Sequence, residues 1–324
     1  MTVQLTRIKR ATFLCPAMTT GGPEAIHQAA QAFNAAGLAT DIAYYRGPGD
    51  ITVDGGRLVC RPVAQNPCLD VYAQYEPVAC RELPLRERHL VVLPEVLAGQ
   101  FATFTRATVA VWWLSVDNML PVTPLMTRRA LLSDRSLVHW HQSAYAEDHL
   151  RSAGVTSQAL GDYTTPEFTT HELSGPTTGR GVAYNPAKGA ELAAGFFAAH
   201  PEHDPVPVAG LSRLETSELF RRTPVYVDFG HFPGKDRMPR EAAASGAVVF
   251  LRDAGAGQFH EDFPVPAFFR FTDEDVTTGE LARRVAAVQA DPLPHWQQQQ
   301  QLRDGIRAER TALHAQVALS LIHI

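Results

Sequence analysis

Residues 225–250, VYVDFGHFPGKDRMPREAAASGAVVF, constrain the fold more than any other part of the chain. They begin with a β-branched and aromatic run at 225–227 and end with a second apolar run at 247–250. Between these runs lie a loop bent by glycine and proline and a segment of strong helix formers, which we expect to begin between Asp236 and Pro239. The segment therefore predicts a strand, a loop, a helix and a second strand, as in a parallel α/β sheet.

Three basic residues, Lys235, Arg237 and Arg240, crowd the predicted start of that helix. The first turn of a helix has unpaired backbone N–H groups and the positive end of the helix dipole, so cations there are unfavourable unless an anion is bound. We interpret the loop as a phosphate-binding site that includes Gly234 and Asp236. A solvated charged face is the alternative.

Length and charge restrict the class of protein. A chain of 324 residues is too long for one ordinary core, so we expect two domains of roughly 150 residues each. The formal charge of −5 provides no global basic field of the kind that attracts nucleic acid. No apolar stretch approaches the roughly 20 residues that span a bilayer, and the N-terminus lacks the apolar core of a signal peptide. We predict a cytoplasmic protein without a transmembrane segment, with peripheral membrane contact left open.

The pattern of potential metal ligands favours no metal site. The cysteines show neither a CxxC pair nor zinc spacing, and we interpret them as buried or incidental thiols: Cys15, Cys60, Cys68 and Cys80. His139 and His141 place two imidazoles on one face of an extended segment, but a third ligand at recognisable spacing is missing. A hydrogen-bonding or acid–base role for one of them is the better interpretation.

Apolar runs and glycine or proline breaks predict two successive doubly wound α/β halves that face a central cleft. Continuous apolar runs in the first half have the composition of buried parallel strands. The first-half predictions are a strand–helix–strand unit at 11–45, strands at 89–95, 107–115 and 136–141, and a helix at 143–154 capped by Ser143 and Gly154. The second-half predictions are strands at 181–185, 205–208, 225–230, 247–251 and 267–271, with helices at 188–199, 213–222, 237–246 and 279–290.

A Thr/Pro/Gly-rich stretch without apolar periodicity, at 161–181, marks the domain boundary. We expect an N-terminal domain at 1–165, a linker at 166–180, a C-terminal domain at 181–292 and a C-terminal helix at 293–318. The glutamine run at 297–301 is expected on the surface of that helix, because apolar residues around it continue a helical stripe. The last six residues, LSLIHI at 319–324, match the translation of a sequencing adapter, and we expect this ending to be artefactual.

In open α/β sheets, ligands bind outside the carboxyl ends of the strands, which selects a short set of residues. In the first half these are the Gly21-Gly22 pair, which precedes a helix, and four polar residues that follow strands: Glu95, Asp117, Asn118 and His141. In the second half Tyr184, Asn185 and Lys188 follow one strand, and the loop from Asp228 to Arg240 follows another. We expect Lys188 to converge with Lys235 and Arg237 on one crevice, as in a pyrophosphate clamp.

Several of these segments resemble the GT-B glycosyltransferases, in particular retaining glycosyltransferase family 4, also called group 1 glycosyltransferases, and a bacterial branch of it. Lys188-Gly189 resembles the KG that begins the first helix of the family's donor domain. Glu241-Ala242, with Ser245-Gly246 and Val248-Val249, resembles its EAxxxGxxVV segment. The helix SAYAEDHLRSAG resembles the one that ends its acceptor domain, and WWLSVDN with DFGHFPGKDRMPREAA resembles the bacterial branch.

The resemblance implies a donor site for a nucleotide sugar, a UDP-, GDP- or TDP-sugar, in the C-terminal domain and an acceptor site in the N-terminal domain. It implies that Glu241 binds the ribose, that Lys188 binds the diphosphate, and that Gly21-Gly22 faces the phosphates. It also implies retaining chemistry without a metal or other cofactor, since fixed cations and N–H dipoles stabilise a leaving diphosphate.

Two positions depart from the family pattern. The first glutamate of the family's E-x7-E motif falls on Pro233, and the arginine that the family places before its helix-opening lysine falls on Ala183. We expect Lys235 and Arg237 to supply the missing positive charge. The acceptor-side roles of Glu95, Asp117, Asn118 and His141 rest on strand-end position alone.

Three functions agree with these residues. The first is a hexosyl-type glycosyltransferase that moves a sugar to a glycan or small-molecule acceptor, for example in polysaccharide biosynthesis. The second is a GT-B module that binds a nucleotide sugar or glycan without turnover, which Pro233 and Ala183 favour. The third, nucleotide-sugar epimerisation, ranks last because the cleft lacks an evident set of carboxylate bases.

Overall fold

The computed structural model describes residues 8–86 and 88–324. The chain forms two compact units. Unit 1 contains the described residues up to Tyr163 together with Arg310–Ile324, and unit 2 contains Thr164–Glu309. Both units are built around parallel sheets, which confirms the predicted α/β class. Among the described residues, no helix combines the length and hydropathy that a membrane crossing requires.

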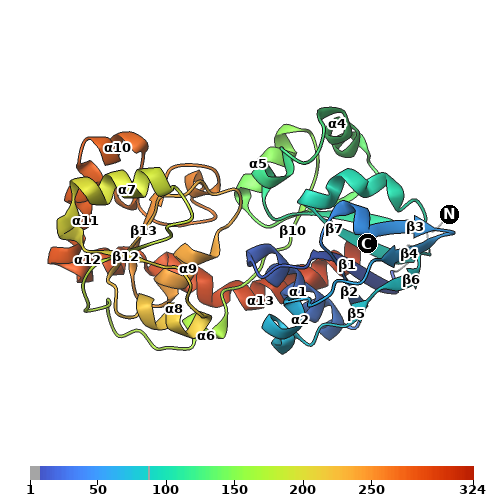
Figure 1. Cartoon of the computed structure of the whole chain (residues 1–324), viewed down its shortest axis with the longest axis horizontal. Coiled ribbons are helices and arrows are strands. Elements are labelled where there is room, and N and C mark those ends of the chain that lie inside the picture. The colour runs from blue at the N-terminus through green and yellow to red at the C-terminus, as the bar shows by residue number, and fades with distance from the viewer. Residues whose placement is uncertain (1–7, 87) are drawn as a thin grey trace. The chain divides into compact units, whose positions relative to one another are not determined.

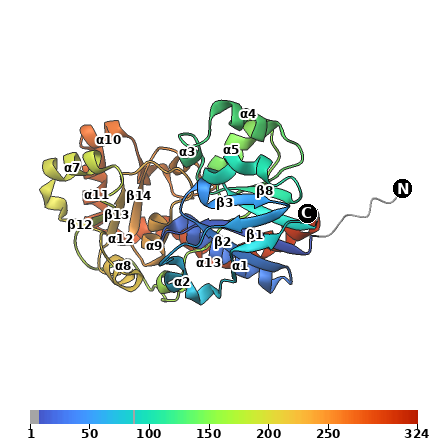
Figure 2. The same ribbon diagram turned by 45° about the vertical axis from the view of Figure 1, so that its right-hand side comes forward.

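The large sheet of unit 1 has seven strands in the order β10-β9-β8-β7-β1-β2-β5, all parallel. Its strands are β1 (Arg10–Pro16), β2 (Ala39–Tyr45), β5 (Ala79–Cys80), β7 (His89–Pro94), β8 (Thr108–Trp113), β9 (Val138–His141) and β10 (Gln158–Ala159). Figure 2 shows β1 and β2 beside α1. The predicted apolar runs are confirmed as central strands, and all six residues of β7 are buried because helices cover both faces of such a sheet.

The α-helices of unit 1 are α1 (Gly21–Ala35), α2 (Cys68–Val71), α3 (Val116–Met119), α4 (Leu125–Ser133), α5 (Ala144–Ser152) and the last part of α13 (Gln300–His323). The predicted N-cap of α5 is confirmed, since the Ser143 side chain accepts a hydrogen bond from the Ala146 backbone N–H at 3.1 Å. Gly154 follows the C-cap residue Ala153 and has a φ of +72°. The core of unit 1 holds Trp112, whose indole N–H donates to the Leu160 carbonyl at 2.8 Å.

A second, antiparallel sheet of unit 1 accounts for residues that the sequence left unassigned. It has three strands, β3 (Ile51–Asp54), β4 (Arg57–Cys60) and β6 (Glu82–Pro84), in the order β3-β4-β6. These strands are short and interrupted by turns, so neither a run of buried residues nor a long alternation marks them in the sequence.

Unit 2 has five parallel strands in the order β12-β11-β13-β14-β15. They are β11 (Val182–Tyr184), β12 (Pro205–Pro207), β13 (Val225–Asp228), β14 (Val248–Arg252) and β15 (Arg270–Phe271). Its helices are α6 (Pro166–Thr169), α7 (Ala190–Ala199), α8 (Arg213–Phe220), α9 (Arg237–Ala244), α10 (Asp273–Thr277), α11 (Glu280–Ala290), α12 (Pro292–Gln298) and the first part of α13 (Gln300–His323). Figure 1 shows α7 and α10 on one side of β13 and α8 and α9 on the other.

Two expectations about irregular and helical segments are corrected. The stretch predicted as a linker contains the helix α6, because Pro166 sets the first helical position and Phe168 is buried against Phe220 with ring centroids 6.5 Å apart. The glutamine run is not continuous helical surface. Gln299 is fully buried between α12 and α13, and its side-chain amide bonds both the N–H and the C=O of Val249, at 3.0 and 2.8 Å.

That contact has a physical reason. The ladder between β14 and β15 pairs only Leu251 and Arg252 of β14, so a neighbouring strand does not satisfy the backbone of Val249 on that side. A buried N–H and C=O require partners, and the Gln299 amide supplies both. At the C-terminal end, residues 319–323 continue α13, and Leu321 and Ile324 pack against the unit 1 core.

Candidate functional site

In each large sheet the chain adds strands first on one side of its first strand and then on the other. We call the pair of neighbouring strands at which this order reverses the switch point of the sheet. In unit 2 the chain goes from β11 outward to β12 and then returns to β13 on the other side of β11, so the switch point lies between β11 and β13. Ligands of open α/β sheets bind at the carboxyl ends of the two strands that flank such a point. Lys188 follows β11 and Asp228 ends β13, so both lie there.

Lys188 is held by carboxylates at this switch point. Its Nζ lies 2.5 Å from Oδ2 of Asp236, the residue that precedes α9. Lys188 therefore contacts the loop after β13, and its partner there is the carboxylate of Asp236. The clamp of Lys188 with Lys235 and Arg237 stays a prediction. Burial raises the pKa of Asp236 to about 6, and the Lys188 ammonium opposes that shift.

Asp228 is a second carboxylate beside Lys188. It is 1% exposed, and its two oxygens accept hydrogen bonds from the Tyr226 hydroxyl and the Gly230 backbone N–H, each at 2.9 Å. Burial raises the pKa of Asp228, while the positive charge of Lys188 and these hydrogen bonds lower it. In this cluster the Lys188 ammonium lies beside two carboxylates, those of Asp228 and Asp236. An anion that binds Lys188 would compete with both.

Gly189 lets the loop after β11 lie directly against the loop after β13. Its φ is +60°, and a Cβ at this position would lie 2.1 Å from the carbonyl oxygen of Phe229. No side chain fits there without moving the backbone, which explains the residue type at this point. Gly230 plays the matching role, because a Cβ on it would lie 3.0 Å from the Cβ of Lys188.

The basic residues at the start of α9 divide into different roles. Arg240 is completely buried, and its guanidinium donates to Glu309 at 2.9 Å and to the backbone carbonyls of Lys235 and Asp236. A fully buried guanidinium with these partners is not available to a phosphate, contrary to the prediction for Arg240. Lys235 is partly exposed, and its Nζ lies 3.3 Å from Glu309.

The other predicted donor-site residues lie at the end of β11, on the loops after β11 and β13, and on α9. Arg237 and Glu241 are half-buried on α9, and the Glu241 charge contributes to the raised pKa of Tyr226, which places it toward β13. Gly234 is buried in the loop before α9. Tyr184 packs on Phe197 with ring centroids 4.7 Å apart, and Asn185 accepts from the Ala187 N–H at 3.0 Å to close the turn before Lys188.

Sequence reasoning missed two residues that organise this region. Glu309, on α13, accepts from Arg240, pairs with Lys235 and accepts from the Thr164 backbone N–H at 2.8 Å. Arg252, at the end of β14, makes a two-point contact with Asp273 at 2.7 Å and donates to the Phe229 carbonyl at 3.4 Å. Arg252 follows a predicted strand, so the strand-end rule would have selected it. No local signal marks Glu309.

The switch point of unit 1 lies between β1 and β7, because β2 and β5 extend the sheet on one side and β7 to β10 on the other. Glu95 follows β7 and is 3% exposed, with Oε2 accepting from the Leu114 N–H at 3.1 Å. Burial raises the pKa of Glu95 to about 8. The glycine pair is corrected from a loop to the first turn of α1, and a Cβ on Gly22 would lie at an ordinary 3.7 Å from Leu114.

The other acceptor-side residues follow β8 and β9. Asp117 accepts from the Tyr145 hydroxyl at 2.8 Å, and Asn118 is exposed on the same short helix, α3. His141 is half-buried, and its Nδ1 lies 2.9 Å from the Ser157 hydroxyl. Burial lowers the pKa of His141.

The neighbouring imidazole lies in the core. His139 is buried and accepts a hydrogen bond from the Trp113 indole at 3.1 Å, and burial lowers its pKa to about 4. Within the described residues, no group of three or more His, Cys, Asp or Glu side chains has the proximity that a metal ion requires. All four cysteines are free thiols, with Cys80 half-buried and the other three buried.

No protein-family model matches this sequence, and a search of curated proteins finds no match. Solved structures do match over nearly the whole chain. Sucrose-phosphate synthase from Thermosynechococcus elongatus is 14% identical, with a TM-score of 0.63 over 97% of this chain and 98% of that one. Anabaena HepE, solved in complex with UDP-glucose, is 10% identical, with a TM-score of 0.64 over 97% of this chain and 100% of that one.

A glycosyltransferase from Rickettsia africae is also 10% identical, with a TM-score of 0.62 over 97% of each chain. Identities this low establish the fold alone, and they do so across both units. The expected GT-B fold is thereby confirmed, with two α/β units and helices at the C-terminal end, while glycosyltransferase family 4 and its bacterial branch stay predictions. The chain therefore has the fold of the two-domain GT-B glycosyltransferases.

Proposed function

We propose that the chain is a glycosyltransferase that uses a nucleotide sugar, with the donor bound at the switch point of unit 2. The observation that carries the proposal is the cluster of Lys188 with Asp236 and Asp228, beside Lys235 and the start of α9. A nucleotide diphosphate would displace Asp236 from Lys188 and accept from the backbone N–H groups of the first turn of α9. The complex of the structural neighbour HepE with UDP-glucose supports this class of donor.

In this proposal each group has one task. Lys188 binds the diphosphate and stabilises the negative charge that grows on it as the glycosidic bond breaks. Lys235 and Arg237 extend the positive charge along the loop, and Glu241 accepts hydrogen bonds from the ribose hydroxyls. The reaction is retaining and requires no metal. Glu95, Asp117, Asn118 and His141 are the acceptor-side candidates, and we propose a glycan or small-molecule acceptor and a cytoplasmic location.

Transfer or hydrolysis from a panel of UDP-, GDP- and TDP-sugars tests the proposal. We expect one nucleotide class to be turned over, and Lys188→Ala to lower kcat/KM by about tenfold or more, the value of one charge-assisted contact. Lys235→Ala and Arg237→Ala should each lower it less, while Arg222→Ala, at an exposed position beyond α8, is the matched control. Near wild-type rates in all three site variants would refute the donor site.

A second candidate is a module that binds a nucleotide sugar without turnover. Ala183 is 0% exposed within β11, so a charged side chain has no space at that position, and Pro233 provides no carboxylate for a sugar. Saturable binding of a nucleotide sugar without release of nucleotide, over long incubation with acceptors present, would identify this function.

A further inference from the structure

A large cavity lies in unit 1 at the amino-terminal edge of the seven-stranded sheet, the edge opposite the switch point. It has a volume of about 1530 Å³ and lies among the first residues of β1, β7 and β8 and the antiparallel strand β6. β1 has seven residues, so its two ends are roughly 20 Å apart at about 3.3 Å per residue. The cavity is therefore distinct from the residues around Glu95.

The cavity is strongly basic. Its lining includes six cationic residues: Lys9, Arg10, Arg81, Arg86, Arg88 and Arg106. Among the described residues, the carboxylates that line it are Asp41 and Glu82, and each has a guanidinium partner. Within the part of the chain that the structure describes, the side chains of Lys9, Arg81, Arg86 and Arg106 have neither an ion pair nor a hydrogen bond. Positive charge gathered in a recess concentrates the potential there.

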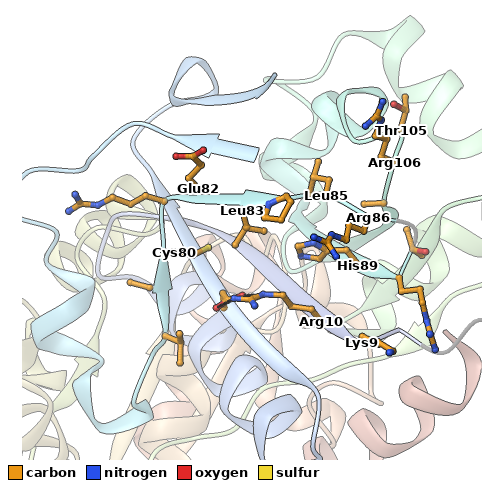
Figure 3. Close-up of a pocket in the computed structure, with 18 residues that line it drawn as sticks. Lys9, Arg10, Cys80, Glu82, Leu83, Leu85, Arg86, His89, Thr105 and Arg106 are labelled. Atoms are coloured by element: carbon orange, nitrogen blue, oxygen red, sulfur yellow. Dashed lines mark hydrogen bonds and ion pairs between the residues drawn. The ribbon is translucent and has the colours of Figure 1, made fainter. Parts of the chain in front are cut away.

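The floor of the cavity is held by buried side chains. His89 is 3% exposed, its Nε2 lies 2.8 Å from the Thr12 hydroxyl, and its ring bonds the Pro84 backbone, so it joins β1, β7 and β6. Asp41 is 3% exposed and holds Arg10 by two contacts, at 2.5 and 2.7 Å. Figure 3 shows Arg86 beside His89, with Lys9 and Arg10 on one side and Arg106 on another. The recess is therefore built before a ligand arrives.

We propose that this cavity binds a small soluble polyanion that carries at least two phosphate or comparable anionic groups. The cations come from separate segments around the recess, so one phosphate cannot contact all of them. A volume above the roughly 300–1,000 Å³ of common ligand pockets accommodates an extended ligand. The recess also favours a soluble ligand over a bilayer, because headgroups in a plane do not fill a concave site. This site is separate from the proposed donor site.

Inorganic tripolyphosphate serves as the probe, with phenylglyoxal modification of arginines in the full chain followed by peptide mass spectrometry. We expect tripolyphosphate to protect Arg81, Arg86 and Arg106 at least fivefold relative to exposed Arg129 on α4. The protection should weaken with added salt. Lys188→Ala should leave it unchanged, which separates this site from the donor site. Equal protection at Arg129, or none at Arg86 and Arg106, would overturn the proposal.

Calorimetric titration with tripolyphosphate provides a second measurement. The double variant Arg86→Ala/Arg106→Ala should weaken binding at this site about fivefold or more, since each exposed charge contributes a few-fold at most. Arg129→Ala is the control, and circular dichroism establishes that both variants are folded. Arginine-dependent binding to vesicles of anionic phospholipid, without binding of tripolyphosphate, would overturn the proposal in favour of a membrane surface.

Discussion

The two switch points share one topology and have opposite electrostatics. At the switch point of unit 2, Lys188 lies between two carboxylates, and the loop that follows β13 carries further cations. At the switch point of unit 1, Glu95 is buried among backbone N–H groups with a pKa raised to about 8. A doubly wound sheet thus places side chains at the carboxyl ends of its strands. The residue types at those ends decide whether the site favours an anion or a neutral group.

The largest effect is expected from the carboxylate that neutralises the loop of unit 2. Glu309→Gln removes the carboxylate charge that the fully buried Arg240 guanidinium contacts at 2.9 Å, so we expect the free energy of unfolding to fall by about 3 kcal/mol. Urea unfolding measures it. Asp304→Asn, on the exposed side of the same helix, is the control and should change stability by less than about 0.5 kcal/mol. A loss for Glu309→Gln of less than about 1 kcal/mol would contradict this account.

The glycines of the two switch points provide a matched comparison. Gly189→Ala places a Cβ 2.1 Å from the Phe229 carbonyl at a positive φ, and we expect a loss of about 2 kcal/mol or more. Gly22→Ala meets Leu114 at 3.7 Å within α1, and we expect a change of less than about 1 kcal/mol. Thermal unfolding of the two variants gives both values. Equal losses would show that close loop packing does not distinguish the two sites.

The pH dependence of stability tests the electrostatics of unit 1. The pKa of Glu95 in the folded protein, about 8, is above its ordinary 4.5, so its burial costs nothing below pH 4.5 and costs most above pH 8. Glu95→Gln should therefore stabilise the protein by about 2 kcal/mol at pH 9 and flatten the fall between pH 5 and 8. Glu147→Gln, at an exposed position of α5, is the control. If the free energy of unfolding depended on pH in the same way in wild type and in Glu95→Gln, the raised pKa of Glu95 would be disproved.

The smallest expected effect concerns nucleotide affinity in unit 2, and it depends on the proposed function. Asp236 competes with a diphosphate for Lys188, and its pKa of about 6 means that it is protonated below that pH. We expect UDP or the preferred nucleoside diphosphate to bind about threefold tighter to Asp236→Asn at pH 8. Near pH 5 the variant and wild type should bind equally. Weaker binding by the variant at both pH values would instead assign Asp236 to orienting Lys188.

The strand-end residues show how far sequence patterns extend. Lys188, Glu95 and the loop after β13 were predictable because a parallel strand has a recognisable apolar run and its carboxyl end has a fixed meaning. Sequence patterns did not predict the pairing of Lys188 with Asp236 or the burial of Arg240. A basic residue at a helix start has the same local sequence whether its side chain faces solvent or a glutamate. The role of Gln299 was missed for the same reason.

The amino-acid sequence alone determined the α/β class, the doubly wound order of strands and helices, and which residues follow each strand, since these depend on local periodicity and capping. The tertiary structure alone decided the partners: Glu309 for Arg240, Gln299 for the Val249 backbone, and the basic cavity between the two sheets of unit 1. Burial and charge pairing depend on residues distant in the chain, and no local pattern records which of them meet.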